Sequence, residues 1–294
     1  MTTIRQALVE ATETLRRAGL RSPRADAELI LTSLLSANRA HLLAHPEQRL
    51  EPSQEKLFCQ WLEKRKEHFP LQYLRGRQEF YGRDFEVSPA VLVPRPETEL
   101  LLEACLRRLS PLPDRPLQVV EVGLGSGCLG ETLILEDPRV ILTGIDISPA
   151  ALQVANRNAL RLGAGSRLRM VAADALSALA RRPFFDLLVS NPPYGALSQS
   201  HLVDEGVRRY EPACAVFAGD SGLEVYEKIF SQAARILKPG AGVLVELGKD
   251  LRPWVEESAR RQGWRPIQVI PDLAGIDRVA EFEPVRPRNG GNPD

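Results

Sequence analysis

The sequence predicts an α/β fold, in which a seven-stranded, mostly parallel sheet with an antiparallel last strand follows a small helical domain. From Leu117 onward, short apolar runs alternate with helical patterns, which favours a parallel sheet covered by helices on both faces. Residues 271–277 alone separate the last two runs, which is too short for a parallel crossover, so this pair should be antiparallel. The predicted strands are 117–123, 140–147, 168–174, 185–190, 241–248, 265–270 and 278–284.

The N-terminal part of the chain predicts helices without a catalytic cluster. Apolar residues recur at helical spacing from Ile4, and Gly19 ends this first helix. Pro23 suits the first position of a second helix, and Pro52 opens a third that runs to about His68. We therefore expect a small helical domain ahead of the sheet.

A hairpin links the two parts. The stretch "QEFYGRDFEV" (78–87) alternates aromatic and polar residues on both sides of Gly82-Arg83, which indicates two short strands and a turn. Further helices are predicted near Thr98–Leu109 and at 127–136, 149–162, 221–237 and 249–262. The predicted boundaries are 1–75 for the helical domain, 76–95 for the hairpin linker, 96–285 for the α/β domain and 286–294 for a disordered tail.

Composition excludes several function classes. Lys and Arg number 38, as do Asp and Glu, so the 294-residue chain has no formal net charge, which argues against a bulk electrostatic grip on nucleic acid. No apolar run approaches the ~20 residues that span a bilayer, and the first residues lack a signal core, so we expect a cytoplasmic protein. The four cysteines form no Cys-x-x-Cys pair and the four histidines are scattered, which predicts reduced thiols and no metal site.

A glycine loop follows the first predicted strand of the sheet. "VVEVGLGSGCLG" (119–130) spaces three glycines as Gly123-Leu124-Gly125-Ser126-Gly127, and a second strand ends in Asp146. Glycines let the backbone turn tightly and approach a ligand, and an acid in this place can accept hydrogen bonds from ribose hydroxyls. The pattern predicts a nucleoside site. The alternative is a plain strand-to-helix turn, with Asp146 as the cap of the next helix.

The details of this loop favour S-adenosylmethionine. Its spacing is not the G-x-G-x-x-G that is usual for NAD, and it holds no basic residue, which suits a ligand without phosphate. Asp174 ends the third strand, where it can accept a bond from the adenine amino group or cap a helix. Glu121 lies within the first strand, either near the ligand's ammonium group or as a polar strand residue.

The stretch "SNPPYG" (190–195) ends the fourth predicted strand beside the glycine loop. Ligands bind at the carboxyl ends of the strands in open α/β sheets, so Asn191 should face the cofactor's reactive end. The Asn191 side-chain oxygen and the Pro192 carbonyl are acceptors, held by a backbone that Pro193 stiffens, and Tyr194 offers a flat face. This predicts a slot for an –NH₂ group in line with a methyl donor, although a rigid turn is the alternative.

With these residues in hand, the chain resembles the class I S-adenosylmethionine-dependent methyltransferases that act on nitrogen. Asn-Pro-Pro-Tyr occurs in DNA adenine, ribosomal-RNA guanine and protein-glutamine methyltransferases, so other stretches must choose among them. Three stretches resemble the release-factor glutamine methyltransferase (PrmC/HemK) family. They are "PLQYLRGRQEFYGRDFEVSPAVLVPRPETELL" (70–102), "EPACAVFAGDSGLEVYEKI" (211–229) and "DLAGIDRVAEF" (272–282).

The resemblance implies a Rossmann-like class I methyltransferase domain and a specific substrate. It implies methylation of the side-chain amide nitrogen of the Gln in the Gly-Gly-Gln motif of class 1 peptide chain release factors, with S-adenosylhomocysteine as the other product. The helical domain would help to dock the release factor, and neither a membrane nor nucleic acid would be required. Asn191 and Pro192 would be catalytic, and Pro193 and Tyr194 would complete the substrate slot. The implied cofactor residues are Gly123, Leu124, Gly125, Ser126, Gly127, Asp146, Asp174, Ala175 and Asn191.

Several positions depart from the family pattern. Glu121 stands where Asp is usual, Leu124 where a small residue is common, and Ala175 where an aromatic is frequent. Glu131 occupies a normally apolar helix position, and Ile276 replaces a more usual Arg. Two other functions stay open: an N-methyltransferase of DNA adenine or RNA guanine, and a catalytically silent binding protein. The first predicts a basic surface or a target-recognition domain, whereas the second conflicts with the intact Asn-Pro-Pro-Tyr slot.

Overall fold

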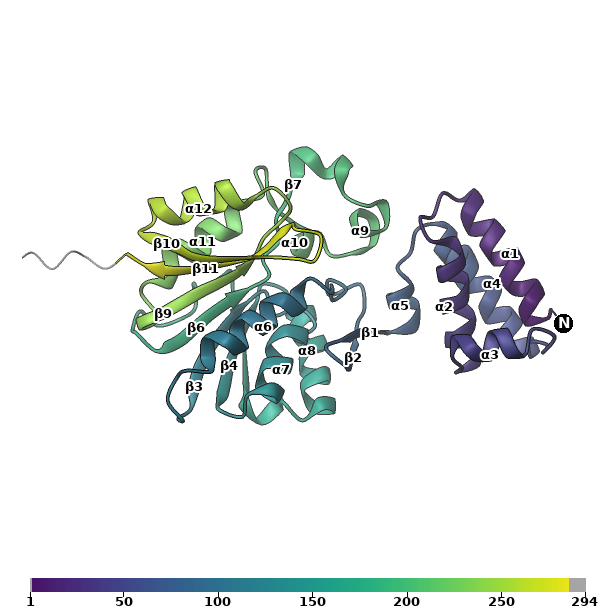
Figure 1. Ribbon diagram of the computed structural model, residues 1–294, viewed down its shortest axis with the longest axis horizontal. Coiled ribbons are helices and arrows are strands. Elements are labelled where there is room, and N and C mark those ends of the chain that lie inside the picture. The colour runs from purple at the N-terminus through teal and green to yellow at the C-terminus, as the bar shows by residue number, and fades with distance from the viewer. Residues whose placement is uncertain (1, 286–294) are drawn as a thin grey trace, which may run out of the picture. The chain divides into compact units, whose positions relative to one another are not determined.

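A computed structural model of the chain describes residues 2–285 (Figure 1). The tail expected to be disordered at 286–294 lies outside the described residues. The chain forms two compact units, which we describe one at a time. The first contains the residues up to Arg77 together with Asp204–Tyr210, and the second contains Gln78–Val203 and the chain from Glu211 onward. In residues 2–285 no helix has the length and apolar character needed to cross a membrane.

The first unit is helical, as the sequence predicts. Thr3 begins α1 with a capping box shared with Gln6, and Pro23 occupies the first turn of α2. The three longest helices pack around one apolar core that includes Leu15, Ile30 and Phe58. The helices of this unit are α1 (Ile4–Arg17), α2 (Pro23–Leu35), α3 (Arg39–Ala44), α4 (Pro52–Lys66), α5 (Leu71–Arg75) and α9 (Glu205–Tyr210).

Helix α9 joins this unit from far along the sequence. The ring of Tyr210 lies edge-on to that of Phe69, with 4.9 Å between the ring centroids. The His68 Nε2 atom lies 3.7 Å from a carboxylate oxygen of Glu205. A Cβ atom on Gly206 would come within 2.5 Å of the His68 carbonyl oxygen, so only glycine allows this close approach. The contacts explain why a short segment after the predicted catalytic loop belongs to the N-terminal helices.

The second unit contains the predicted seven-stranded sheet, in the order β10-β11-β9-β6-β3-β4-β5. Strands β3, β4, β5, β6 and β9 are parallel, and β11 is antiparallel to both of its neighbours, which confirms the predicted fold class. Two small sheets accompany it: the expected hairpin β1-β2, and the pair β7-β8, which the sequence pattern did not indicate. The strands are β1 (Arg77–Phe80), β2 (Arg83–Glu86), β3 (Leu117–Val122), β4 (Val140–Asp146), β5 (Leu168–Ala172), β6 (Phe185–Ser190), β7 (Gly195–Ala196), β8 (Phe217–Gly219), β9 (Leu237–Glu246), β10 (Trp264–Pro271) and β11 (Asp277–Pro284).

Helices cover both faces of the large sheet. In Figure 1, α6, α7 and α8 lie on one face, and α11 and α12 lie on the other. Alternate strand residues point to opposite faces, so Val119 belongs to the first apolar core and Val120 to the second. The helical elements are α6 (Thr98–Leu109), α7 (Cys128–Glu136), α8 (Pro149–Leu162), η1 (Gly165–Arg167), η2 (Leu197–Leu202), α10 (Ala213–Val216), α11 (Glu224–Ala233) and α12 (Arg252–Arg261).

One helix begins later than its apolar pattern suggests. The expectation for α11 was 221–237, but the helix spans Glu224–Ala233. The Glu224 carboxylate accepts the backbone N–H groups of Ser221 and Gly222, and these bonds hold the three preceding residues in a turn. The turn that the Glu224 side chain holds therefore sets where the helix begins.

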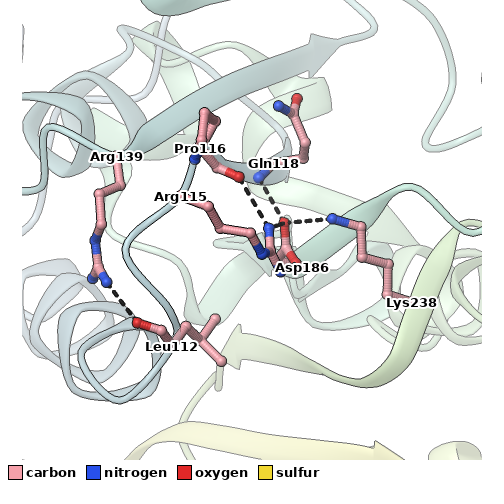
Figure 2. Close-up of polar contacts among 7 residues, drawn as sticks. All are labelled: Leu112, Arg115, Pro116, Gln118, Arg139, Asp186 and Lys238. Atoms are coloured by element: carbon pink, nitrogen blue, oxygen red, sulfur yellow. Dashed lines mark hydrogen bonds and ion pairs between the residues drawn. The ribbon is translucent and has the colours of Figure 1, made fainter.

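A buried carboxylate fixes the amino-terminal edge of the sheet. Figure 2 shows Arg115 and Lys238 reaching Asp186, which begins β6 together with Phe185. Asp186 accepts hydrogen bonds from Arg115 Nη2 at 2.6 Å, from Lys238 Nζ at 2.8 Å and from the Gln118 N–H at 2.8 Å. Since these partners precede or belong to β3 and β9, the cluster ties three neighbouring strands together at the end opposite their carboxyl termini.

Replacing Asp186 by Asn should lower the free energy of unfolding of the α/β unit by about 3 kcal/mol. The change removes the charge from a 5 % exposed side chain and leaves Arg115 and Lys238 without their anion. Denaturant unfolding followed by circular dichroism at neutral pH measures the difference. Asp114→Asn, at an exposed position, serves as the matched control. Equal stability of the two variants would show that the cluster contributes nothing.

The contribution of Asp186 should disappear in acid. Burial raises the pKa of its carboxyl, but hydrogen bonds from Arg115 and Lys238 outweigh burial and hold the pKa below its ordinary value. A lowered pKa in the folded state gives stability that is present above the unfolded pKa and lost as the pH falls through the folded one. The difference between the wild type and Asp186→Asn should therefore narrow below about pH 4.

Candidate active site

One pocket of the second unit opens at the carboxyl ends of β3, β4 and β6. Strand β3 lies between β4 and β6 in the sheet. The chain runs from β3 to β4 and β5 in one direction along the sheet and then returns to β6 on the opposite edge of β3. Ligands bind at such a switch point in open α/β sheets. Among the residues that line the pocket are Gly123, Asp146, Asp174 and Asn191, so the structure brings the separate sequence motifs together.

The glycine loop forms one wall of this pocket. Gly123, Gly125 and Gly127 have φ angles of 81°, 57° and 84°, in the left-handed region that other residues rarely adopt. A Cβ atom on Gly125 would meet nothing within 4 Å, so a bound molecule can approach the backbone there. On Gly127 it would lie 2.0 Å from Glu131 Oε1, so the Glu131 side chain on α7 would have to move to admit a larger residue.

Asp146 is held against the glycine loop by two backbone groups. Its Oδ2 accepts the Gly125 N–H and its Oδ1 accepts the Ser148 N–H, each at 2.8 Å. It does not cap α8, because the Ser148 hydroxyl accepts the Ala151 N–H in that role. Burial raises the Asp146 pKa, and the two N–H donors oppose this rise. Each carboxylate oxygen keeps acceptor capacity that ribose hydroxyls can use.

Asp174 and Ala175 line another part of the same pocket, just after β5. The Asp174 Oδ2 atom lies 2.7 Å from Lys228 Nζ, and both side chains are about half exposed. Ala175 is buried and has a φ of 48°, a left-handed conformation that is uncommon for a residue with a Cβ atom. The turn directs Asp174 to the pocket and leaves it free to accept a further hydrogen bond, as the predicted adenine contact requires.

Asn191 lies directly beside the glycine loop. The Ser190 hydroxyl donates to the Val122 carbonyl at 2.7 Å, which joins the ends of β6 and β3. A Cβ atom on Gly123 would lie 3.5 Å from the Asn191 carbonyl oxygen. The Asn191 side-chain Nδ2 donates to Thr98 Oγ1 at 3.0 Å, and this leaves Oδ1 as an acceptor. With Pro192 and Pro193, Asn191 lines the same pocket as the glycine loop.

Tyr194 lies deeper than its predicted role suggests. A Cβ atom on Gly248 would come within 2.7 Å of Tyr194 Cδ2, so the ring packs closely on that glycine. The ring also contacts the apolar core beneath α11, and burial raises the pKa of its hydroxyl to about 12. Its neutral phenol can support the loop from behind, while its predicted contact with the substrate amide stays a prediction.

Two buried glutamates stand behind the glycine loop. Glu131 is fully buried and neither carboxyl oxygen has a hydrogen-bond partner, and Glu121 Oε2 also has none. Burial raises the pKa of Glu131 to about 9 and raises that of Glu121 well above its ordinary value, so the charged form of both carboxyls is disfavoured. Burial thus opposes a negative charge at both of these departures from the family pattern, and Glu121 also lines the pocket.

The residues that sequence reasoning missed come from two flanking segments. Arg95 and Thr98 line the pocket on one side and Pro212 on another. The buried carboxylate of Glu211 joins the segments, because it accepts the Val93 N–H at 3.0 Å and the Arg95 guanidinium at 2.5 Å. The "PRPETE" stretch contains Arg95, but no local sequence pattern indicates that Arg95 pairs with an acid more than a hundred residues away. Among residues 2–285 no group of three metal-ligating side chains occurs.

This fold and pocket define a class I S-adenosylmethionine-dependent methyltransferase. The chain is 44% identical over 277 residues to the "Release factor glutamine methyltransferase" of Koribacter versatilis, covering 94% of this chain and 97% of that protein. It is 41% identical to the protein of the same name from Moorella thermoacetica, covering 94% and 96%. The chain belongs to the release factor glutamine methyltransferase family, which confirms the resemblance seen in the sequence.

Family models agree with this assignment, and a solved structure agrees with the fold. The model described as "PrmC N-terminal domain" matches residues 6–76, and the "Methyltransferase small domain" matches residues 97–207. The structure "Crystal structure of hMettl16 catalytic domain in complex with MAT2A 3'UTR hairpin 1" gives a TM-score of 0.55 at 15% identity, covering 87% of this chain and 90% of that one. At this identity the likeness shows the fold alone.

Proposed function

We propose that this chain methylates the side-chain amide nitrogen of the Gln in the Gly-Gly-Gln motif of class 1 peptide chain release factors. The proposal depends mainly on the Asn191 side chain, which lines the pocket beside the cofactor loop. Its Nδ2 donates to Thr98 Oγ1, and its Oδ1 is left to accept a hydrogen bond from a substrate. The names of relatives that match the chain almost end to end support the choice of substrate. Such an enzyme works in the cytoplasm, where translation ends.

The residues around the pocket fit the cofactor. S-adenosylmethionine, when bound, supplies a methyl group on an electrophilic sulfonium. The open side of Gly125 admits a ligand to the backbone, and Asp146 offers carboxylate oxygens to the ribose hydroxyls. Asp174 and Ala175 receive the adenine, where Asp174 accepts from the exocyclic amine. The remaining loop residues, Leu124 and Ser126, complete this wall.

The catalytic step depends on two acceptors at the end of β6. Asn191 Oδ1 and the Pro192 carbonyl accept the two N–H groups of the substrate amide and turn its nitrogen toward the methyl. Held in this way, the amide nitrogen would lie in line with the methyl group that bound S-adenosylmethionine would supply, and on accepting it the nitrogen would release one proton to water. Proximity and orientation of this kind supply effective molarities of ~10⁵ M or more.

The helical N-terminal unit docks the release factor in this proposal, and the reaction needs no nucleic acid. The match of residues 6–76 to the family's N-terminal domain supports a family-specific role for this unit. The formal charge of zero supports a protein substrate. No observation favours DNA adenine or RNA guanine as the substrate, so nucleic acids are included in the test below as alternative substrates.

Incubation with cofactor labelled in its methyl group tests the proposal. Separate reactions contain release factor, release factor with the motif Gln replaced by Ala, ribosomal RNA, or DNA. We expect label in the unaltered release factor and background levels in the other three reactions, because the slot is built for a primary amide. Label confined to nucleic acid would overturn the proposal, and equal labelling of both release factors would place the methyl elsewhere.

A further inference from the structure

A buried chain of hydrogen bonds runs behind the catalytic loop. Asn191 Nδ2 donates to Thr98 Oγ1 at 3.0 Å, and Thr98 Oγ1 donates to Glu246 Oε2 at 2.7 Å. Thr98 begins α6 and Glu246 ends β9, and both are almost completely buried, with 3 % and 2 % of their surfaces exposed. Three segments that are distant in the sequence thus converge on one side-chain amide.

The direction of these bonds follows from the number of protons available. A threonine hydroxyl has one proton and two lone pairs, and an ionised carboxylate can only accept. When Glu246 is ionised, the Thr98 proton is committed to it, and Thr98 presents only lone pairs to Asn191. A rotated amide would place its oxygen against those lone pairs, so the orientation with Nδ2 toward Thr98 is favoured.

We propose that Thr98 and Glu246 are positioning residues that hold the Asn191 amide with its oxygen toward the substrate. This inference rests on the proposed function, in which Asn191 Oδ1 accepts from the substrate amide. The opposite orientation would present an –NH₂ group to the substrate –NH₂, and two donors cannot bond to each other. The hydrogen bonds from Asn191 through Thr98 to Glu246 therefore determine whether the slot can bind a substrate amide.

The surroundings of Glu246 make this device sensitive to pH. Burial raises the pKa of its carboxyl to about 7, while the hydrogen bond from Thr98 opposes the rise. Its backbone carbonyl also accepts the Tyr226 hydroxyl at 2.6 Å, which anchors the end of β9. The other ionisable groups that act on it are Glu97, which raises the pKa, and Arg278 and Arg95, which lower it. The charge of Glu246 in turn raises the pKa of the Tyr194 phenol.

Protonation of Glu246 should release the Asn191 amide. Below about pH 7 the carboxyl carries its own proton, so the Thr98 hydroxyl is free to donate to Asn191 instead. The Asn191 amide can then rotate so that its oxygen accepts from Thr98. As the pH falls, a growing fraction of the enzyme presents the Asn191 –NH₂ group to the substrate. At saturating cofactor and release factor, kcat should fall as the pH drops through this range.

The matched pair Thr98→Val and Thr98→Ser tests the position of the hydroxyl. Valine keeps the shape but removes the acceptor, and one buried hydrogen bond is enough to change the orientation preference, and hence kcat, about 10- to 100-fold. We expect this loss in Thr98→Val with cofactor affinity unchanged within about twofold, and a return to within about threefold of the wild type in Thr98→Ser. A wild-type kcat in Thr98→Val would overturn the proposal.

Glu246→Gln tests the charge. The neutral amide cannot titrate, so the acid loss of kcat near pH 7 in the wild type should be absent in this variant. Retention of the acid limb in Glu246→Gln would contradict the proposal, because another group would then cause it. An unfolded variant would be recognised by circular dichroism, and the measurement below does not depend on it.

A spectroscopic readout separates this inference from the proposed function. The side-chain –NH₂ signals of Asn191 in ¹⁵N-labelled full-length protein, assigned by their loss in Asn191→Ala, should shift with a midpoint near pH 7 in the wild type and stay constant in Thr98→Val. If the wild type methylates no release factor but shows this titration, the proposed function is wrong and the positioning role of Thr98 and Glu246 is supported. If the signals do not titrate, the positioning role is contradicted even in an active enzyme.

Discussion

Asn191→Ala is expected to lower the rate of methyl transfer by about 10²- to 10³-fold, while the dissociation constant of S-adenosylmethionine changes less than tenfold. Loss of a single preorganised polar contact in a catalytic site has an effect of this size. The Asn191 oxygen is one of only two proposed acceptors for the substrate amide, so alanine leaves one N–H without a partner and the nitrogen misaligned. The cofactor wall formed by Gly125 and Asp146 is untouched by this change.

Single-turnover kinetics and cofactor titration measure the two quantities separately. The matched control is Asn156→Ala, an exposed asparagine on α8, which should behave as the wild type. Turnover that survives in Asn191→Ala would refute the amide slot. A parallel collapse of cofactor binding would instead assign Asn191 mainly to the cofactor.

Asp146→Asn is expected to weaken cofactor binding about 100-fold. Asp146 is the carboxylate that the Gly125 and Ser148 N–H groups hold beside the loop, and hydrogen bonds to a charged group contribute about 1.5–3 kcal/mol each. Asparagine keeps the shape but offers one acceptor oxygen in place of two. It cannot serve both backbone donors and the ribose hydroxyls.

Isothermal titration with S-adenosylmethionine measures this loss. At saturating cofactor the value of kcat should stay within a few-fold of the wild type, because Asp146 does not touch the reacting nitrogen in the proposed arrangement. Asp114→Asn, at an exposed position, controls for the change of charge. An unaltered dissociation constant in Asp146→Asn would show that the ribose lies elsewhere.

The central motifs could be predicted because each is local in sequence and the sheet aligns them. Asn191 follows a fully buried strand and Gly123 follows its neighbour, so the topology of a parallel sheet brings the two together without further information. The antiparallel end of the sheet followed in the same way from the short connection at 271–277. Only the rules of chain connectivity were needed.

The supporting contacts could not be predicted because they join distant residues. Thr98 and Glu246 are separated by 148 positions, and Val93 and Glu211 by 118, and neither pair has a local pattern. Helix α3 was missed because it has six residues, and its beginning depends on the Asn38 cap rather than on apolar periodicity. Long-range polar pairs and very short elements lie outside the reach of periodicity.

Mass spectrometry of release factor incubated with the enzyme and S-adenosylmethionine tests the central claim most directly. The account predicts one added methyl group on the peptide that contains Gly-Gly-Gln, with fragmentation placing it on the Gln side chain, and an unmodified peptide when Asn191→Ala replaces the wild type. An unmodified Gln in the presence of active wild-type enzyme, or a methyl group on another residue, would contradict it.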